Sequence, residues 1–345
     1  MLAATVRTPL VYVVDDDADV LASFQFLLEI EGFCVRTFHS GEALLNAMRL
    51  GDADCFLIDY EMPGMSGMEV CSRLKSDPRI ALTQVPDIGQ QYLAFDQARD
   101  ELQDSDVKGR NPFKDLRVRR ALYQAIDIET LRVKLMNGLA APTGGYTPSP
   151  LAAFNDPELE RRLPFDLAAA RRQMAEAGYA DGFDVTIDCP NNRYVNDDEM
   201  CIALAAMWAQ IKVRVKVNAM PRSTYFPRME KWDTSMYLLG WGGAVTDAET
   251  TLTPVMRNPG AKGEGLYNYG RSRNDKFDTL AAQSTVEADP AKREGLIKAA
   301  LREWKEQVHS IPLHRQVIPW AARSNVTAVH RADNWLEVQW ITVAK

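Results

Sequence analysis

The sequence has no long hydrophobic run, no excess of positive charge and no recognisable targeting segment. Its apolar stretches fall short of the roughly 18 residues that a membrane-spanning helix needs. Its first residues lack the basic start and apolar stretch of a secretory signal. A net charge of −7 argues against a nucleic-acid partner. As written, the chain is therefore predicted to be cytoplasmic.

Cysteine is scarce and its spacing carries no motif. The sequence holds five cysteines: Cys34, Cys55, Cys71, Cys189 and Cys201. None belongs to a CxxC pair or to a Cys/His spacing that is typical of a metal site. We therefore expect all five to be reduced thiols that pack as small hydrophobic side chains.

Catalytic motifs are absent from the larger part of the chain. Residues 87–345 contain no Gly-x-Ser-x-Gly, P-loop or Rossmann fingerprint and no visible pair of nucleophile and base. His309, His314 and His330 lack metal-like spacing with cysteines or carboxylates, so we expect them to be structural. The sequence therefore predicts that the protein is not an enzyme.

Length and charge divide the chain into two segments. A chain of 345 residues predicts about two domains, and 46% hydrophobic residues give each of them enough apolar material for a core. Residues 1–86 hold 6 basic and 13 acidic residues and so carry the whole net charge, whereas residues 87–345 are neutral. We interpret 1–86 and 87–345 as separate domains.

The first segment alternates apolar strands with amphipathic helices. The strands are predicted at 11–14, 33–38 and 54–59, and the helices at 18–31, 41–50 and 68–76. This β-α-β-α-β-α order predicts an α/β fold with a parallel sheet and right-handed crossovers.

Acidic residues follow two of these strands. Asp15 and Asp16 end the first strand and Asp59 ends the third, and such ends meet at one edge of a doubly wound sheet. A pair of carboxylates 4 Å apart repels by ~4 kcal/mol at an effective dielectric of ~20. A hard divalent cation relieves this repulsion, so we predict a Mg²⁺ site here. For Asp17 and Asp19 we prefer helix capping or plain solvation.

The stretch "VYVVDDD…CFLIDYEMPGMSGMEV" resembles a bacterial response-regulator receiver domain. The resemblance implies a flavodoxin-like fold, with Asp15 and Asp16 holding Mg²⁺ and Asp59 as phosphoacceptor. It also implies a histidine kinase as partner. It covers only the first three of five βα units. The family's Ser or Thr after strand four and Lys after strand five have no counterpart, since Thr83 comes too early.

The second segment reads as an α/β body with mixed sheets. Helices are predicted after the capping residues Asp115, Asp127, Asp166 and Asp289 and at 197–211, and strands at 91–95, 183–190, 213–220, 234–243, 311–323 and 336–343. The stretches "NPFKDLRVRRALYQAIDIETL", "AEAGYADGFDVTI", "YLLGWGG" and "IPLHRQVIPWAAR" together resemble the C-terminal half of a family 5 oligopeptide-binding protein of an ABC importer. This resemblance covers 88–345. It implies one lobe of a periplasmic-binding-protein-like fold, an oligopeptide or other small solute, an ABC permease as partner and an extracytoplasmic location.

Trp241 is the candidate wall of a binding cleft, because it is a large ring beside Gly242 and Gly243 at the end of a strand. Peptide-binding members of the family place an Asp shortly after the Gly-Trp pair, and that position is Ala244 here. Asp247 fits the later acid of the segment. The departure at Ala244 favours a solute other than a peptide with a free amino terminus.

Both resemblances end at Pro86–Asp87, so we interpret the chain as a truncated receiver joined to an incomplete solute-binding protein. The truncation should leave the strand at 54–59 as an unpaired edge. The alternative function is a two-component response regulator that is phosphorylated on Asp59.

Overall fold

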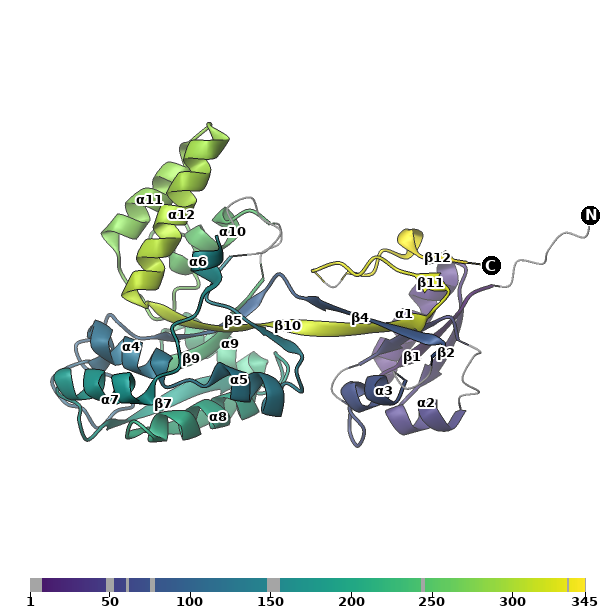
Figure 1. Ribbon diagram of the computed structural model, residues 1–345, viewed down its shortest axis with the longest axis horizontal. Coiled ribbons are helices and arrows are strands. Elements are labelled where there is room, and N and C mark those ends of the chain that lie inside the picture. The colour runs from purple at the N-terminus through teal and green to yellow at the C-terminus, as the bar shows by residue number, and fades with distance from the viewer. Residues whose placement is uncertain are drawn as a thin grey trace, which may run out of the picture. The chain divides into compact units, whose positions relative to one another are not determined.

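The computed structural model describes residues 8–47, 53–59, 62–74, 78–147, 156–242, 246–333 and 335–344. They form two compact units (Figure 1). Met1–Val85 and Val317–Lys345 make the first unit, and Pro86–Gln316 makes the second. The chain thus changes unit at Val85–Pro86, beside the predicted junction, and again at Gln316–Val317. Among the described residues, no helix is long and apolar enough to cross a membrane.

The first unit contains the predicted alternation of strands and helices. Its elements are β1 (Leu10–Val14), α1 (Ala18–Ile30), β2 (Cys34–Phe38), α2 (Gly41–Ala47), β3 (Cys55–Ile58) and α3 (Gly67–Leu74). β1 lies between β2 and β3 and is parallel to both. The carboxylate of Asp17 caps α1, and Gly32, with φ of +86°, lets the chain turn back into β2.

Alternate residues of β1 face two hydrophobic clusters. Val11 and Val13 pack with Leu21 and Leu28 of α1. Tyr12 and Val14 pack on the other face with side chains of α2 and α3, among them Leu44 and Val70. The period of two along the strand therefore sets which helix covers which face.

A strand from the C-terminal part of the chain corrects the prediction of an unpaired third strand. β10 (Ser310–Arg323) runs antiparallel to β3 and pairs Ala321 with Phe56 and Ala322 with Cys55. β4 (Ile80–Pro86) pairs with β10. The edge of β3 is covered because a strand from the far end of the sequence supplies its backbone partners, which local sequence patterns do not reveal.

The end of the chain belongs to the first unit. It forms the short strands β11 (Val326–Thr327) and β12 (Thr342–Val343), which pair with each other, and the 3₁₀ helix η4 (Val338–Trp340). The prediction of one continuous strand over 336–343 is therefore wrong. The first unit also leaves large apolar side chains exposed: Phe24, Phe26, Leu27 and Ile30 of α1, and Trp335 and Trp340 near the C-terminus.

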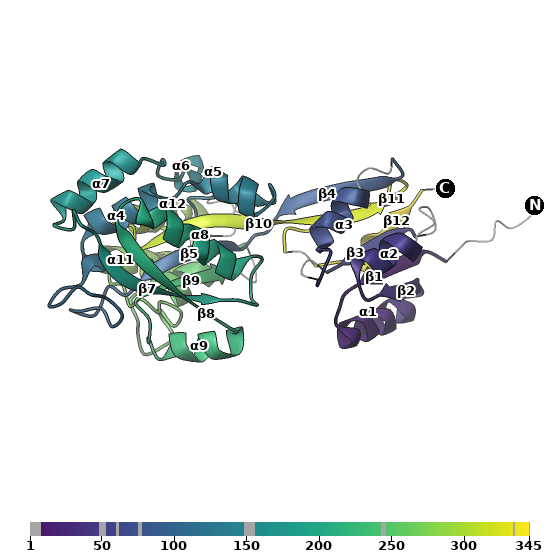
Figure 2. The same ribbon diagram turned by 90° about the horizontal axis from the view of Figure 1, so that it is seen from below.

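The second unit is built on a mixed sheet, as predicted (Figure 2). β5 (Gln90–Phe95) runs antiparallel to β10 and to β9 (Met236–Trp241). β7 (Phe183–Pro190) is parallel to β9 and to β8 (Val213–Met220). The short β6 (Ala140–Pro142) pairs with β10.

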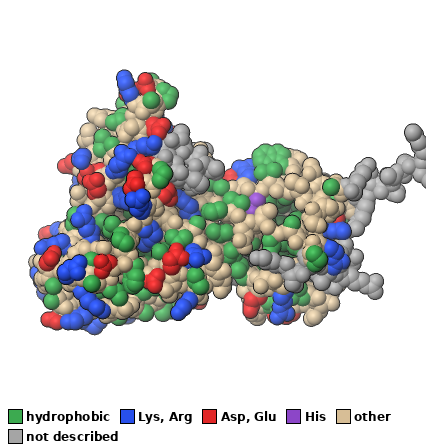
Figure 3. All heavy atoms as spheres, viewed as in Figure 1, with side chains coloured by type: hydrophobic (Ala, Val, Ile, Leu, Met, Phe, Trp, Pro, Cys, Tyr) green, Lys and Arg blue, Asp and Glu red, His purple; other side chains and the backbone are tan. Residues whose placement is uncertain are grey.

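Helices cover both faces of this sheet. They are η1 (Pro112–Lys114), α4 (Leu116–Gln124), α5 (Ile128–Thr130), η2 (Leu131–Leu135), α6 (Pro157–Glu160), α7 (Leu167–Glu176), α8 (Asp197–Ala209), α9 (Arg222–Glu230), α10 (Glu249–Thr251), η3 (Leu252–Met256), α11 (Asp275–Val286) and α12 (Pro290–Gln307). On β5, Leu93 and Phe95 join the cluster with α4, α7 and α8. Tyr92 and Ala94 face the other cluster, which includes α11 and α12. Over α11 and α12, acidic and basic side chains are interspersed (Figure 3).

The helix starts of the second unit follow the capping prediction. Side-chain oxygens of Asp115, Asp127, Asp166 and Asp289 accept hydrogen bonds from backbone amides of the first turns that follow. These bonds satisfy amide donors that a helix leaves open at its start. Local sequence was therefore sufficient to place these helices.

A disulfide joins Cys189, at the end of β7, to Cys201 in α8. The prediction of five reduced thiols is thus wrong for these two residues, and Cys34, Cys55 and Cys71 are the free ones. The two bonded residues are 12 apart in sequence, too far for a short motif, and only the packing of α8 against β7 brings them together.

Removing this disulfide should weaken the second unit. For a closed loop of about 15 residues, the chain-entropy model gives a loss of roughly 3 kcal/mol. We expect the Cys189→Ala/Cys201→Ala double variant to unfold at lower urea concentration than the wild-type protein. Adding a reductant should lower the wild-type midpoint but not that of the variant. The control is Cys34→Ser at an exposed free thiol, and equal midpoints for all three proteins would contradict the prediction.

Candidate functional site

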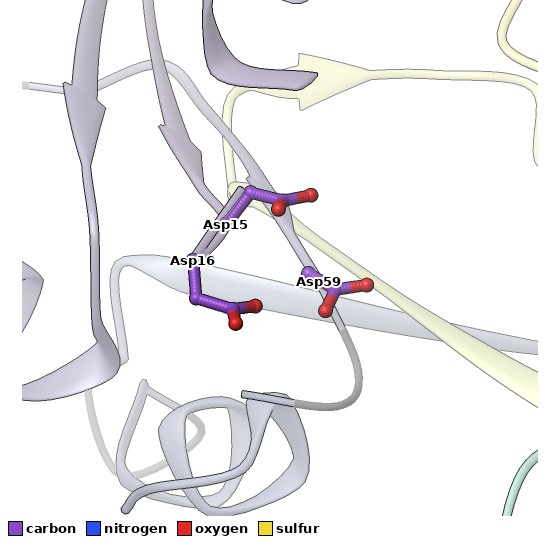
Figure 4. Close-up of side chains that lie close together, drawn as sticks. All are labelled: Asp15, Asp16 and Asp59. Carbon is purple, nitrogen blue, oxygen red and sulfur yellow. The ribbon is translucent and has the colours of Figure 1, made fainter. Parts of the chain in front are cut away.

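Three carboxylates meet at the carboxyl ends of β1 and β3, as the sequence predicted. One oxygen from each of Asp15, Asp16 and Asp59 lies within 4.8 Å of the others. Figure 4 shows the three side chains pointing to the same side of the strand ends. The sheet sets this arrangement, because the Asp59 amide donates to Val14 O at 2.7 Å and the Asp15 amide to Phe38 O at 3.1 Å.

Burial and neighbouring negative charge set the electrostatics of this carboxylate cluster. Burial raises the pKa of Asp15, the hydrogen bond from the Asp17 amide opposes the rise, and the neighbouring charges of Asp16 and Asp17 add to it. Oxygen donors of this kind suit a hard divalent ion such as Mg²⁺. The chemistry of the donor set therefore fits the predicted metal.

The surroundings of the carboxylate cluster differ from those of a complete receiver. The strand beside β3 is β10, and its residues 317–322 read VIPWAA, which offers no lysine. Thr83 lies on β4, which pairs with β10, and its hydroxyl is 3.1 Å from Nδ1 of His330. An antiparallel strand thus occupies the place next to β3.

Trp241 lies at the end of β9 and is half-buried. Its indole Nε1 donates to Thr250 O at 2.9 Å, and its ring centroid is 4.8 Å from that of Tyr267. Gly242, the next residue, is exposed. Gly243 and Ala244 lie outside the described residues. The ring is thus held by the Thr250 carbonyl and the Tyr267 ring and remains partly exposed.

Asp247 is held by protein groups. Its carboxylate lies 2.9 Å from Arg293 of α12 and accepts a hydrogen bond from the Glu249 amide, also at 2.9 Å. The Arg293 bond is the main reason that the pKa of Asp247 is lowered, and the Glu249 amide adds to the effect. Asp247 therefore ties the start of α10 to α12, a structural role that the sequence did not indicate.

Two glycines near Trp241 allow close packing, and one of them, Gly89, escaped sequence reasoning. A Cβ on Gly89 would lie 3.1 Å from the Cα of Gly242, and a Cβ on Gly240 would lie 2.6 Å from the ring of Tyr194. The Tyr194 hydroxyl donates to Gly240 O at 3.2 Å. The glycines permit these close approaches, and the Gly240–Trp241–Gly242 run was the available signal.

His309 and His314 are buried, and His330 packs on an aromatic ring. Buried His309 lies 2.9 Å from Oε1 of Gln97 and 3.2 Å from Nδ2 of Asn274. Burial lowers the pKa of His309 to about 3 and that of His314 to about 4, and a nearby Arg side chain adds to each shift. His330 stacks on Trp320 with 4.1 Å between ring centroids.

Buried His314 should make the protein less stable in mild acid. The unfolded chain takes up a proton near the ordinary pKa of 6.5, whereas the folded chain resists protonation until about 4. The folded-state pKa is lowered, so the full stability is present above pH 6.5 and declines as the pH falls toward 4. Over that window the loss from His314 is on the order of 3 kcal/mol.

Urea titrations between pH 7.5 and 4 measure this loss. The His314→Leu variant should lose less unfolding free energy over the window than the wild-type protein. Circular dichroism at pH 7.5 checks that the variant folds. Parallel pH profiles for the two proteins would show that His314 does not titrate as inferred.

A family model described as "Bacterial extracellular solute-binding proteins, family 5 Middle" matches residues 28–263. The match starts inside the first unit, so the prediction that this likeness begins only after Pro86–Asp87 is wrong. The comparisons give no evidence for a receiver domain in residues 1–86.

Curated relatives are similar at low identity. The probable deoxycholate-binding periplasmic protein of Escherichia coli is 27% identical over 209 residues, 59% of this chain and 38% of the relative. Heme-binding protein A of Haemophilus influenzae is 25% identical over 252 residues, which are 71% of this chain and 43% of the relative. A glutathione-binding protein of Shigella dysenteriae is 25% identical over 286 residues, which are 81% of this chain and 51% of the relative. The chain spans about half the length of these relatives or less, and they are solute-binding proteins rather than enzymes, as predicted.

Solved structures share the fold. The periplasmic binding protein DppA from Helicobacter pylori, in complex with a peptide, aligns with a TM-score of 0.68 at 18% identity and covers 90% of this chain and 56% of its own. The murein tripeptide binding protein MppA of Escherichia coli aligns with a TM-score of 0.64 at 20% identity. The alignment covers 90% of this chain and 58% of MppA. These likenesses show the α/β fold of periplasmic binding proteins and nothing finer.

Proposed function

We propose that this chain, which belongs to family 5 of the bacterial extracellular solute-binding proteins, binds a small organic solute for uptake through an ABC permease. The family match carries the proposal. The half-buried ring of Trp241, fixed at the end of β9 by Thr250 O and Tyr267, supports it as a contact surface. Gly242 beside it leaves room for a ligand to approach the backbone.

The class of solute follows from what the relatives' names state and from one position in the sequence. The relatives are named for deoxycholate, heme and glutathione, which are organic molecules that all carry carboxylate groups. Ala244 stands where peptide-binding members have an Asp, and Asp247 is already paired with Arg293. We therefore favour a solute that is recognised without an acidic anchor for an amino group.

The disulfide supports an extracytoplasmic location. Disulfides persist in oxidising compartments and are rare in the cytosol, and Cys189 and Cys201 are both fully buried. We therefore replace the expectation of a cytoplasmic protein with a proposal that the folded protein acts outside the cytoplasm.

Isothermal titration with deoxycholate, heme, glutathione and a pool of tri- to pentapeptides tests the proposed function. We expect deoxycholate or heme, which lack an amino group, to bind more tightly than glutathione or the peptide pool. Trp241→Ala should weaken that binding by about tenfold, or about 1.4 kcal/mol, because it removes an aromatic contact surface. Trp335→Ala is the matched control at an exposed tryptophan of the first unit. Equal losses in both variants, or binding of peptides alone, would refute the assignment.

We also propose that Asp15, Asp16 and Asp59 bind Mg²⁺. The clustered oxygens support this second function, and Asp59 is the candidate phosphoacceptor if a histidine kinase or small phosphodonor acts on it. The antiparallel β10 beside β3 argues against a working phosphorelay. We therefore favour cation binding alone over the response-regulator alternative.

Thermal unfolding with and without Mg²⁺ tests the cation site. At a concentration about tenfold above Kd, binding adds about 1.4 kcal/mol of stability, so the wild-type melting temperature should rise. Asp59→Asn should lose most of this rise, whereas Asp19→Asn, at an exposed acid of α1, should keep it. With acetyl phosphate, intact mass should show no stable phosphorylated species. A stoichiometric species that Asp59→Asn abolishes would restore the response-regulator alternative.

A further inference from the structure

A small cavity lies inside the second unit, beneath β5. Both polar and aromatic side chains line it. They come from β5, β9, α10, η3, α12, β10 and the segments around Tyr146, Asn268 and His309. The cavity has room for about one water molecule.

Two of the polar side chains around this cavity have no hydrogen-bond partner. They are the hydroxyl groups of Tyr92 on β5 and Thr251 on α10, whose residues are 3% and 1% exposed. The other polar side chains of the lining all make hydrogen bonds: Gln90, Gln97, Tyr146, Tyr237, Asn268, Ser272, Trp304, His309 and Ser310.

Leaving two hydroxyl groups unpaired in one cavity is unfavourable. A buried polar group without a partner destabilises a protein by about 1–3 kcal/mol, and such groups are commonly satisfied by ordered water. A water needs a polar site with about 2–4 hydrogen-bonding groups and enough room. The cavity beneath β5 meets both requirements.

We propose that an ordered water molecule occupies this cavity and bridges the Tyr92 and Thr251 hydroxyls. The bridge joins β5 to α10. Neither hydroxyl makes a direct hydrogen bond that could do this. Thr250, the neighbour of Thr251, accepts the hydrogen bond from Trp241 Nε1. The water therefore helps to fix the segment that holds the Trp241 ring, and this last step rests on the proposed solute-binding function.

Isosteric substitutions distinguish a bridged pair of hydroxyls from two unpaired ones. If the water is present, Thr251→Val and Tyr92→Phe each remove one of its partners, and each should lower the melting temperature by a few degrees. If the hydroxyls are unpaired, the same changes remove buried polar groups that have no partner, and each should raise it. The sign of the shift decides between the two states.

A double-mutant cycle tests whether the two hydroxyls share one water. In Thr251→Val/Tyr92→Phe, the loss should be smaller than the sum of the single losses, because both variants disrupt the same bridge. In the matched cycle with Thr251→Ser, which keeps a hydroxyl, the effect of Tyr92→Phe should match that in the wild-type protein. Additive effects in the first cycle, or a rise in melting temperature, would overturn the proposal.

A high-resolution crystal structure supplies a direct check. It should show a water within about 2.5–3.0 Å of both hydroxyl oxygens, and an empty cavity would overturn the proposal. The link to Trp241 is tested by titrating Thr251→Val with whichever of the four solute samples binds the wild-type protein. We expect this variant to bind that solute severalfold more weakly than the wild-type protein does. The stability cycle stands even if no solute binds, so failure of the solute-binding function and failure of the water site are distinguishable.

Discussion

The backbone pairing of β10 is the interaction on which both units depend. Its first residues pair with β5, where Ser310 lies opposite Ala94, and its last residues pair with β3, where Ala321 lies opposite Phe56. Each pairing satisfies N–H and C=O groups that would otherwise lie at an open strand edge. Without β10, β3 keeps only β1 as a partner strand and β5 keeps only β9.

The features that sequence reasoning found are those set by local chemistry. Asp15, Asp16 and Asp59 were placed together because the ends of parallel strands meet at one sheet edge, and that needs only the order of strands and helices. Capping by Asp115 and Asp289 needs only the few residues that follow each of them. In these places the local preference and the folded structure agree.

The features that sequence reasoning missed depend on contacts between residues that are far apart in the sequence. The partner of β3 comes from more than 200 residues further along the chain, and the Cys189–Cys201 bond needs α8 to pack on β7. The pairing of Asp247 with Arg293 likewise joins α12 to the start of α10. The placement of Trp241 was a hypothesis from glycine content alone, and the groups that hold its ring could not be read from the sequence.

The first unit is discontinuous in sequence, because the whole of Pro86–Gln316 separates its two parts. During synthesis β1, β2 and β3 emerge first, but their antiparallel neighbour emerges near the end of the chain. The second unit has nearly all its strands and helices before that point and can begin to fold earlier. The exposed edge of β3 must therefore wait through most of translation, a period in which a chaperone or a competing strand could reach it. The order of the sequence thus makes the smaller unit the later one to be completed.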